Sequence, residues 1–521
     1  MNIKEMIVPI LLAFLITVGF NYYFGSTQQP QQEQAVLSGT TEVAPRPTQD
    51  MRPISTEIDF IDEQAAVVPH ETIVETDYAR LTFSTAGASM TRMEYKHVTG
   101  SVTKPLIAYK VSEGQRERHA FLLAFDARTP YNYDFVSLAD SQDAAVVTYS
   151  YPVTAATALR KTFTVHKKNC RIDLRVELVG AALATATRFR IVMPSPSLAG
   201  LANDTVRIVA NKSDDVTLYT NLKEAATLLW RIPTLFGLDD RYFVFAMVHD
   251  AAHVVQKAFL RFDAPQELSA FFETADQQQP VSLELSFYIG PKRSAAIEAV
   301  DPRLQLVMDY SYWGPIAKPL LWSLNTIYEY VHNYGLAIIL LTLLIKLLLL
   351  PFSLHGQRSL SSNAEFSRKM KYLEQKYQND KEQLSHQQSE LIRQHGVGGF
   401  LGGCLPMFVN IPLFLALGKV LNTAIELYQA RFLWVPDLAQ KDPYYIFPLL
   451  GAVTISWSIL PMLSAKPTAS SRTKNIFPMI AFALIFTAFA AGLPAGLSLF
   501  MFVSALLGTL QSVVLKRYVK A

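Results

Sequence analysis

The sequence predicts a polytopic α-helical membrane protein with six transmembrane helices and a large exported antiparallel β-sandwich domain. Half of the 521 residues are hydrophobic and only 17% are charged. The charge is uneven, because residues 26–310 carry an ordinary share and several later stretches carry almost none. This asymmetry indicates a soluble domain joined to a membrane domain. Within the soluble part, apolar residues alternate with a period of two, as they do in half-buried strands.

Net charge, cysteine content and motif content exclude several function classes. The formal net charge of +3 is too small to predict direct nucleic-acid binding. Cys170 and Cys404 lie in different kinds of segment, so we expect two buried thiols and no disulfide. The sequence has no G-x-x-x-x-G-K-S/T loop, no H-E-x-x-H and no G-x-S-x-G. We therefore expect no enzyme activity, cofactor, metal or nucleotide use.

Residues 1–25 are predicted to form an N-terminal transmembrane anchor. The run 6–24 is long enough to cross a hydrocarbon core of about 30 Å, and two tyrosines at its end suit the membrane interface. A cleaved signal peptide is the alternative, but no A-x-A-like site follows the run. Residues 26–56 are rich in Gln, Pro, Thr and Ser and are predicted to be a flexible linker.

Residues 57–305 are predicted to form the periplasmic antiparallel β-sandwich. In 171–178 and in 281–289, apolar residues occupy every second position, as on the buried face of a strand. The tetrapeptide HKKN at 166–169 fits a turn between strands on either side of it. Nothing in this region has the pattern of a catalytic site, and the sequence predicts no ligand for it.

Residues 306–521 contain the remaining predicted spans, at 335–354, 400–421, 444–463, 475–493 and 495–514. The last two are separated only by Leu493-Pro494 and are predicted to form a helical hairpin. Lys and Arg gather in 355–398, 464–474 and 515–521, which the positive-inside rule places on the cytoplasmic side. Six spans then put both termini in the cytoplasm and residues about 25–334 in the periplasm.

Two further helical elements flank the second span. In 315–332, apolar residues repeat at steps of three and four beside several aromatic residues, which predicts an amphipathic helix at the membrane surface. Packing against the β-domain is the alternative. The polar segment 355–398 has helical spacing on both sides of Asn379-Asp380, which predicts a cytoplasmic helical hairpin. It is either a solvated connector or a docking arm for a ribosome or an emerging chain. The glycines at 396–403 predict a flexible joint into the next span.

Lys346 is the strongest candidate for a functional side chain within a span. It follows Ile345, the midpoint of the run 336–354, and a Lys at the centre of a span disfavours insertion by roughly 2.5–3.5 kcal/mol. Snorkelling is the alternative, but the end of the run lies about 12 Å further along a helix. We therefore expect Lys346, with Thr342 one turn earlier, to face a polar, water-filled cavity. Other polar residues could line it or simply pack: Asn410, Asn422, Ser456, Ser458 and Thr487.

These features, in this order, resemble the family of bacterial YidC, mitochondrial Oxa and chloroplast Alb membrane protein insertases. The resemblance covers the whole chain and is strongest from about 309 to 514. It is carried by DYSYWGPIAKPL, LGGCLPMFVNIPLFLAL, DPYYIFPLL and LPAGLSLFMFVS, and by SFYIGPK in the exported part. The exported domain and the first span are similar to the Gram-negative form of the family.

The resemblance implies a core of five spans around a hydrophilic groove, located in the bacterial inner membrane. It implies that Lys346, where Arg is usual, Thr342 and Asn410 line this groove. It also implies that substrates slide along the third and fifth spans, which include Ile411 and Pro412. The implied partners are nascent membrane proteins, the Sec translocon, membrane lipids and a ribosome at the hairpin and basic tail.

The predicted function is therefore insertion, folding and assembly of integral membrane proteins, alone or with the Sec translocon and without nucleotide. Two departures from the family pattern affect the groove. Lys346 lacks the planar fork and fixed protonation of Arg, and Phe500 and Met501 stand where hydroxylated aromatic residues are common. Two rival functions are a small-molecule transporter with Lys346 as counter-charge and an assembly factor whose exported domain does the binding. The sequence has no inverted repeat, which argues against the transporter.

Overall fold

The computed structural model describes part of the chain between residues 58 and 518. It divides into two compact units, Met1–Pro53 with Pro351–Phe408, and Ile54–Leu350 with Val409–Ala521. The predicted N-terminal span 6–24 and the linker 26–56 lie outside the described residues. The described residues are 58–61, 68–96, 106–111, 115–125, 128–180, 188–195, 206–212, 215–225, 227–250, 253–264, 267–275, 282–308, 310–351, 369–370, 372–377, 381–463, 480–481 and 483–518.

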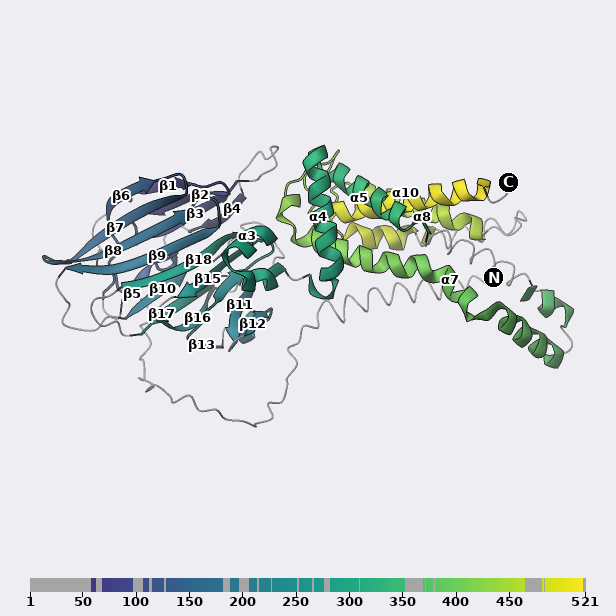
Figure 1. Ribbon diagram of the computed structural model, residues 1–521, viewed down its shortest axis with the longest axis horizontal. Helices are drawn as coiled ribbons and strands as arrows, with labels where there is room; N and C mark the ends of the chain where they lie inside the picture. Colours follow the sequence, from purple (N-terminus) through teal and green to yellow (C-terminus); the bar gives the residue numbers. More distant parts are fainter. Residues whose placement is uncertain are drawn as a thin grey trace, which may run out of the picture. The chain divides into compact units, whose positions relative to one another are not determined.

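Three antiparallel sheets make up the β-domain (Figure 1). The four-stranded sheet has the order β1 (Glu71–Glu75), β2 (Ala79–Ser84), β3 (Ser89–Tyr95), β4 (Leu106–Lys110). The five-stranded sheet has the order β13 (Trp230–Arg231), β16 (Val255–Ala264), β17 (Glu267–Thr274), β10 (Phe189–Met193), β5 (Leu123–Phe125). The nine-stranded sheet has the order β12 (Asp215–Tyr219), β11 (Arg207–Lys212), β14 (Phe236–Asp239), β15 (Phe243–Asp250), β18 (Ser282–Pro291), β9 (Arg171–Gly180), β8 (Thr157–His166), β7 (Ala144–Thr154), β6 (Asp134–Asp140).

The nine-stranded sheet packs face to face on the two smaller sheets, which confirms the predicted β-sandwich. Phe163 of β8 lies 4.9 Å from the ring of Phe83 of β2. Phe287 of β18 lies 6.2 Å from the ring of Phe272 of β17. All four rings are fully buried, so the core is the space between the layers, where aromatic contacts add to area burial.

The predicted strand pair around residues 166–169 is confirmed. β8 ends at His166 and β9 begins at Arg171, and the two pair antiparallel from Thr157 opposite Gly180 to Val165 opposite Ile172. β18 differs from the prediction in one respect, because its second face is buried at Ser286 and Tyr288, which are at most 3% exposed, although Ser282 and Glu284 on the same face are exposed. Arg171 of the neighbouring strand β9 reaches this part of the face, where its Nη2 donates to Ser286 Oγ at 3.1 Å.

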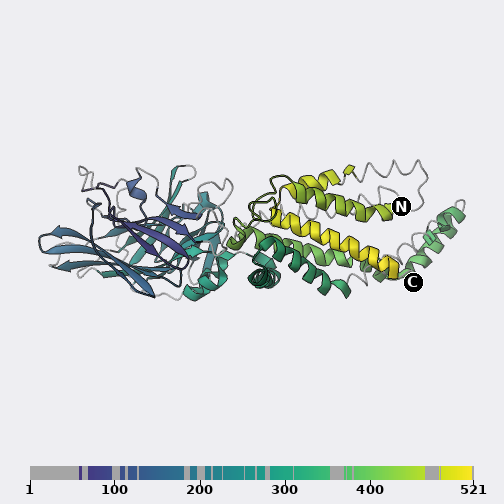
Figure 2. The same ribbon diagram turned by 90° about the horizontal axis from the view of Figure 1, so that it is seen from above.

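Helices make up the rest of the described chain (Figure 2). Those that belong to the exported part are α2 (Leu222–Ala225), α3 (Ser294–Val300), η1 (Arg116–Arg118) and η2 (Pro302–Met308). Those that follow are η3 (Ser311–Trp313), α4 (Gly314–Val331), α5 (Tyr334–Leu348), α7 (Lys381–Thr423), η4 (Ile425–Leu427), α8 (Ile446–Leu463) and α10 (Ala495–Tyr518). α10 packs against both α5 and α8.

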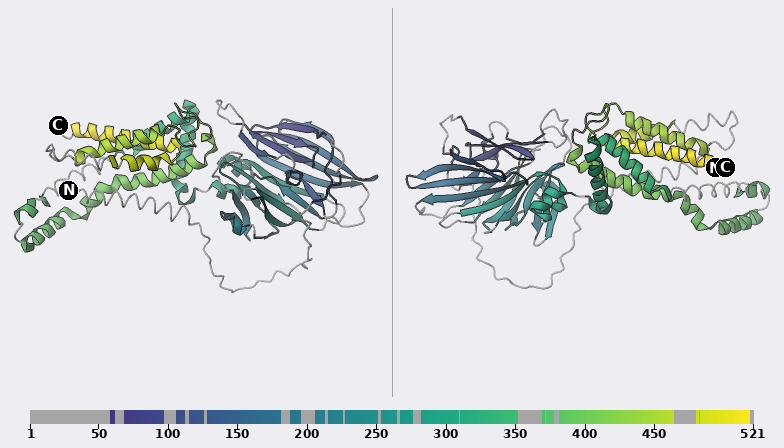
Figure 3. Two further views of the ribbon diagram at one scale, coloured as in Figure 1. Left: turned by 180° about the vertical axis from the view of Figure 1, so that it is seen from behind. Right: turned by 45° about the horizontal axis from the view of Figure 1, so that its top comes forward.

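α4 is the predicted amphipathic helix, and it runs across α10 instead of alongside it (Figures 1 and 3). Ala317, Leu320 and Leu324 are buried, whereas Trp322 and Tyr330 are 70% and 81% exposed. The corner into α5 is made by His332, which has a left-handed φ of 51°, and by Asn333, whose side chain accepts the N–H of Leu336 at 3.0 Å. A short polar corner of this kind lets the chain change direction between two helices.

The glycines 396–403, where the sequence predicts a flexible joint, lie within a helix. α7 is helical without interruption from Lys381 to Thr423 and passes through these glycines. Glycine disfavours a helix by about 1 kcal/mol each, but its backbone can adopt helical angles. The predicted cytoplasmic hairpin and the third span are therefore joined by one long helix.

Candidate functional site

α5 carries two of the predicted groove residues, Lys346 and Thr342. Lys346 is half-buried in the last turn of this helix. The hydropathy run predicts a longer helix around it; α5 ends at Leu348, and a turn at Leu349 separates it from Leu350 and Pro351, which are again helical. The physical reason is Pro351, which has no N–H to donate to the carbonyl of residue 347. Lys346 thus lies close to carbonyls at a helix C-terminus, where a cation is favoured.

Thr342 lies one turn before Lys346 and is 1% exposed. Its Oγ1 donates to the carbonyl oxygen of Ile338 at 2.6 Å, so its hydroxyl proton is used within its own helix. The oxygen can still accept a hydrogen bond. Among the described residues, no carboxylate is paired with the ammonium of Lys346.

The other predicted site residues lie on α7. Asn410 is exposed, and Ile411 and Pro412, which follow it, are half-buried. Within the described part of the chain, no hydrogen bond joins Lys346 or Thr342 to Asn410. The grouping of these residues in one groove therefore stays a prediction.

The other polar candidates in the spans differ in their hydrogen bonding. Thr487 Oγ1 donates to the carbonyl of Ala483 at 2.8 Å. Ser456 of α8 is the exception, because its buried hydroxyl has no hydrogen-bond partner. An unpartnered hydroxyl between packed helices is costly unless water or a ligand reaches it, which makes Ser456 a stronger groove candidate than the sequence alone indicated. The side chain of Ser458 lies outside the described residues.

Two family models match the chain in adjacent stretches. The model described as the YidC periplasmic domain matches residues 71–323, and the model described as the 60Kd inner membrane protein matches residues 326–521. The chain belongs to the YidC family. The resemblance drawn from the sequence motifs is thereby confirmed, with a β-sandwich periplasmic domain and a helical inner-membrane part.

Relatives named membrane protein insertase YidC match all or part of this chain. A protein of Geobacter metallireducens named membrane protein insertase YidC is 27% identical over 99% of both chains. A protein of the same name from Thioalkalivibrio sulfidiphilus is 38% identical over 46% of this chain and 42% of its own. A solved structure of an active YidC insertase with its first transmembrane domain resolved covers 86% of this chain and 93% of its own, at 16% identity and a TM-score of 0.38.

Sequence reasoning missed the loop of residues 424–445, which joins α7 to α8 in this YidC chain. The side chain of Asp442 accepts hydrogen bonds from the indole N–H of Trp434 at 3.1 Å and from the N–H of Phe447 at 2.8 Å. Asp437 accepts the N–H of Ala439 at 2.9 Å. The signal was present, since an Asp shortly before an apolar run is typical of a helix start.

The same loop also bonds to the start of α10. The N–H groups of Ala495 and Gly496 donate to the carbonyls of Gln440 and Leu438 at 2.6 and 2.9 Å. The first N–H groups of a helix have no intrahelical partners. The loop supplies carbonyl acceptors for these groups at the start of α10, directly after Leu493-Pro494. The loop therefore holds the neighbouring ends of α7, α8 and α10 together.

The predicted helical hairpin lies in the other compact unit. Lys369, Tyr372 and Leu373 line a hollow together with Gln387, Glu390 and Leu391 of α7. Residues from both sides of the predicted Asn379-Asp380 turn thus lie together, as an antiparallel helical hairpin requires. The turn itself lies outside the described residues.

Proposed function

We propose that this chain is a membrane protein insertase of the bacterial inner membrane, which assists the insertion, folding and assembly of integral membrane proteins. The observation that carries the proposal is the match to relatives named membrane protein insertase YidC over 99% of the chain. The two family models support the same function for both parts of the chain.

The proposed topology has six spans, with both termini in the cytoplasm and residues about 25–334 in the periplasm. Within the described residues, Ala495–Val514 is one helical stretch long and apolar enough to cross a membrane, and Tyr334–Leu348 and Ile446–Trp457 are shorter apolar helices. The uneven placement of Lys and Arg supports the orientation. The proposed boundaries are 1–25 for the anchor, 26–56 for the linker, 57–305 for the β-sandwich and 306–521 for the insertase core.

The proposed mechanism uses a wet groove between the core helices, lined by Lys346, Thr342 and Asn410. A hydrophilic tail that crosses hydrocarbon leaves polar groups unpaired, which is strongly disfavoured. A groove that holds water part-way through the bilayer shortens this dry path. Lys346 attracts an acidic tail into the groove, and the apolar segment of the substrate then enters lipid along Ile411 and Pro412 of α7. Transfer of that apolar segment supplies the free energy, without nucleotide.

The proposed partners follow from the same arrangement. Nascent membrane proteins are the substrates, taken alone or together with the Sec translocon. The helical hairpin at 355–398 and the basic tail at 515–521 are proposed to meet a ribosome, because both segments carry several Lys and Arg residues. Membrane lipids border the groove.

The charge of Lys346 is tested by replacing it in a strain whose own insertase is depleted. For a client with an acidic tail, Lys346→Ala is expected to lower insertion at least about tenfold, or about 1.4 kcal/mol, whereas Lys346→Arg keeps it. A client with a neutral tail should be little affected. Lys318→Ala, at an exposed position of α4, is the matched control. Full insertion of the acidic client by Lys346→Ala would rule out an essential charge.

A further inference from the structure

Arg241 of the exported domain makes two hydrogen bonds to the membrane core. Its Nε donates to the carbonyl oxygen of Asn422 at 2.8 Å, and its Nη2 donates to the carbonyl oxygen of Ala439 at 3.1 Å. Asn422 is in the last turn of α7, where carbonyls have no intrahelical partner. Ala439 belongs to the 424–445 loop. One guanidinium thus ties the end of α7 to that loop, which a planar group with several fixed donors can do.

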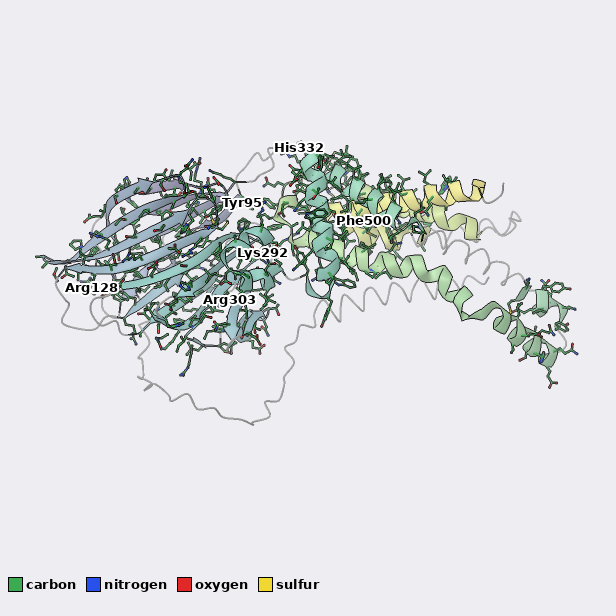
Figure 4. All side chains as sticks on the ribbon, viewed as in Figure 1. Tyr95, Arg128, Lys292, Arg303, His332 and Phe500 are labelled. Atoms are coloured by element: carbon green, nitrogen blue, oxygen red, sulfur yellow. The ribbon has the colours of Figure 1, made fainter. Side chains whose placement is uncertain are left out.

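The backbone on either side of Arg241 is held rigidly. Asp240 Oδ1 accepts the N–H of Tyr242 at 2.8 Å and that of Phe243 at 2.7 Å, which closes the turn between β14 and β15. On the other side, Asp239 is fully buried between two cations, Arg207 at 2.8 Å and Lys292 at 2.5 Å. Figure 4 labels Lys292 at this end of the β-domain. The backbone that carries Arg241 is thus fixed before the side chain makes its bonds, so ordering this turn adds little to the entropy cost of the contact.

Two neighbouring contacts reinforce the one made by Arg241. The ring of Tyr242, which lies under the guanidinium at 4.9 Å, meets the ring of Tyr428 edge-on at 5.4 Å. Arg293, at the end of β18, lies 3.7 Å from the carboxylate of Glu426. Burial raises the pKa of Glu426, and the guanidinium of Arg293 counteracts this. Three residues of the exported domain therefore converge on 422–439.

We propose that Arg241 is a positioning residue for insertion: it holds the end of α7 and the 424–445 loop as a closed outer seal over the core. The inference rests on the proposed function, in which this loop faces the periplasm and α7 carries the substrate path. Asn422 lies about 18 Å along a straight helix from Asn410. Anchoring the far end of α7 therefore fixes the direction in which Ile411 and Pro412 are presented.

The seal is tested by thiol labelling of the full-length chain in intact membranes. Thr423→Cys, in a Cys404→Ser background, reports exposure of the α7 end to a membrane-impermeant maleimide added from the periplasmic side. Cys170 can stay, because it is 3% exposed and burial raises the pKa of its thiol to about 12. Arg241→Ala is expected to raise the labelling rate about tenfold, because two hydrogen bonds to a charged donor are lost. The labelling rate of Arg241→Lys should lie between those of the unmodified chain and Arg241→Ala, because one ammonium replaces the planar guanidinium with its several donors.

Insertion is measured in the same strains, together with thermal unfolding of the exported domain. Arg241→Ala is expected to slow insertion about two- to fivefold without changing the unfolding temperature of that domain. Arg128→Ala is the matched control, because Arg128 is 55% exposed in its side chain, pairs with Asp59 and lies at the other end of the β-domain (Figure 4). It should change neither rate.

Unchanged labelling in Arg241→Ala would overturn the inference, as would an equal rise in Arg128→Ala. Neither result would contradict the proposed insertase function, because the labelling experiment does not require a client protein. Conversely, full insertion by Lys346→Ala leaves the labelling result intact, so the two proposals fail separately.

Discussion

At the scale of single residues, Asp240 is a buried carboxylate with only half of its hydrogen-bonding capacity used. Its Oδ2 has no partner, while Oδ1 accepts two backbone N–H groups. Burial raises the pKa of this carboxyl from 3.8 to about 6. The folded domain therefore binds the proton more tightly than the unfolded chain does. The stability that this provides is complete below pH 3.8 and is lost as the pH rises through about 6.

Asp240→Asn tests this pH dependence. The amide oxygen can still accept from Tyr242 and Phe243, but the buried charge is gone. Above pH 6 we expect the variant to be more stable by about 1–3 kcal/mol, and the fall in stability between pH 4 and 6 should be shallower. Calorimetry of the exported-domain transition across pH 4–8 measures both. If the stability of the unmodified chain and that of Asp240→Asn changed with pH in parallel, Asp240 would not titrate in this range.

Lys161 shows what the sequence could not predict at this scale. It occupies an inward position of β8, where the alternation leads one to expect an apolar residue, and it is fully buried. Its ammonium donates to the carbonyls of Gly87, Ala88 and Phe121 at 3.0, 2.5 and 2.8 Å. These acceptors are all residues with positive φ, and they lie 40 to 74 positions away in the chain. A partner set so distant in sequence has no local signal, whereas Lys346 stood out because its whole surroundings are apolar.

At the scale of elements, short-range periodicity correctly predicted the type of a helix or strand and its buried face where these depend on that element alone. The β8–β9 pair and the amphipathic α4 follow from alternation and from steps of three and four, since both patterns depend on one buried face. Two features depended on neighbours and were missed. The burial of Ser286 and Tyr288 on the second face of β18 depends on side chains from elsewhere, such as Arg171 of β9. The glycines of α7 are helical because the helix continues on both sides of them. Local patterns could not test the predicted groove either. Its proposed residues lie on α5 and α7, which are separated in the sequence by the predicted hairpin.

Gly335 marks a close approach between two elements that can be tested directly. A Cβ built on this first-turn residue of α5 would overlap the ring of Phe432 in the 424–445 loop. Gly335→Ala is therefore expected to lower the stability of the core by about 1–3 kcal/mol, measured by thermal unfolding of the purified protein. Adding Phe432→Ala should restore part of it by making room.

Gly508→Ala is the matched control, because a Cβ at this position of α10 meets nothing within 4 Å. The better helix propensity of Ala should leave stability unchanged or raise it by up to about 1 kcal/mol. Equal effects at positions 335 and 508 would mean that α5 does not pack closely on the loop.

At the scale of the whole molecule, three side chains of the exported domain contact the membrane core at defined points. The core has its own contacts, in which α10 packs on α5 and α8 and the 424–445 loop joins the helix ends. The exported domain adds Arg241, Tyr242 and Arg293 from outside. We therefore predict that the core still inserts clients without the domain, but with a looser seal.

Deletion of residues 57–300 distinguishes an insertase that works through its membrane core from an assembly factor whose exported domain binds the client. Because the groove residues and the core helices remain, we expect insertion to fall only about as far as in Arg241→Ala, two- to fivefold. Adding Arg303→Ala or any other change within the remaining exported residues should lower it no further, whereas adding Lys346→Ala should abolish insertion of a client with an acidic tail. The measurement is rescue of an insertase-depleted strain with both client types. Complete loss of insertion in the deletion, at unchanged protein level, would instead place the essential binding surface in the exported domain.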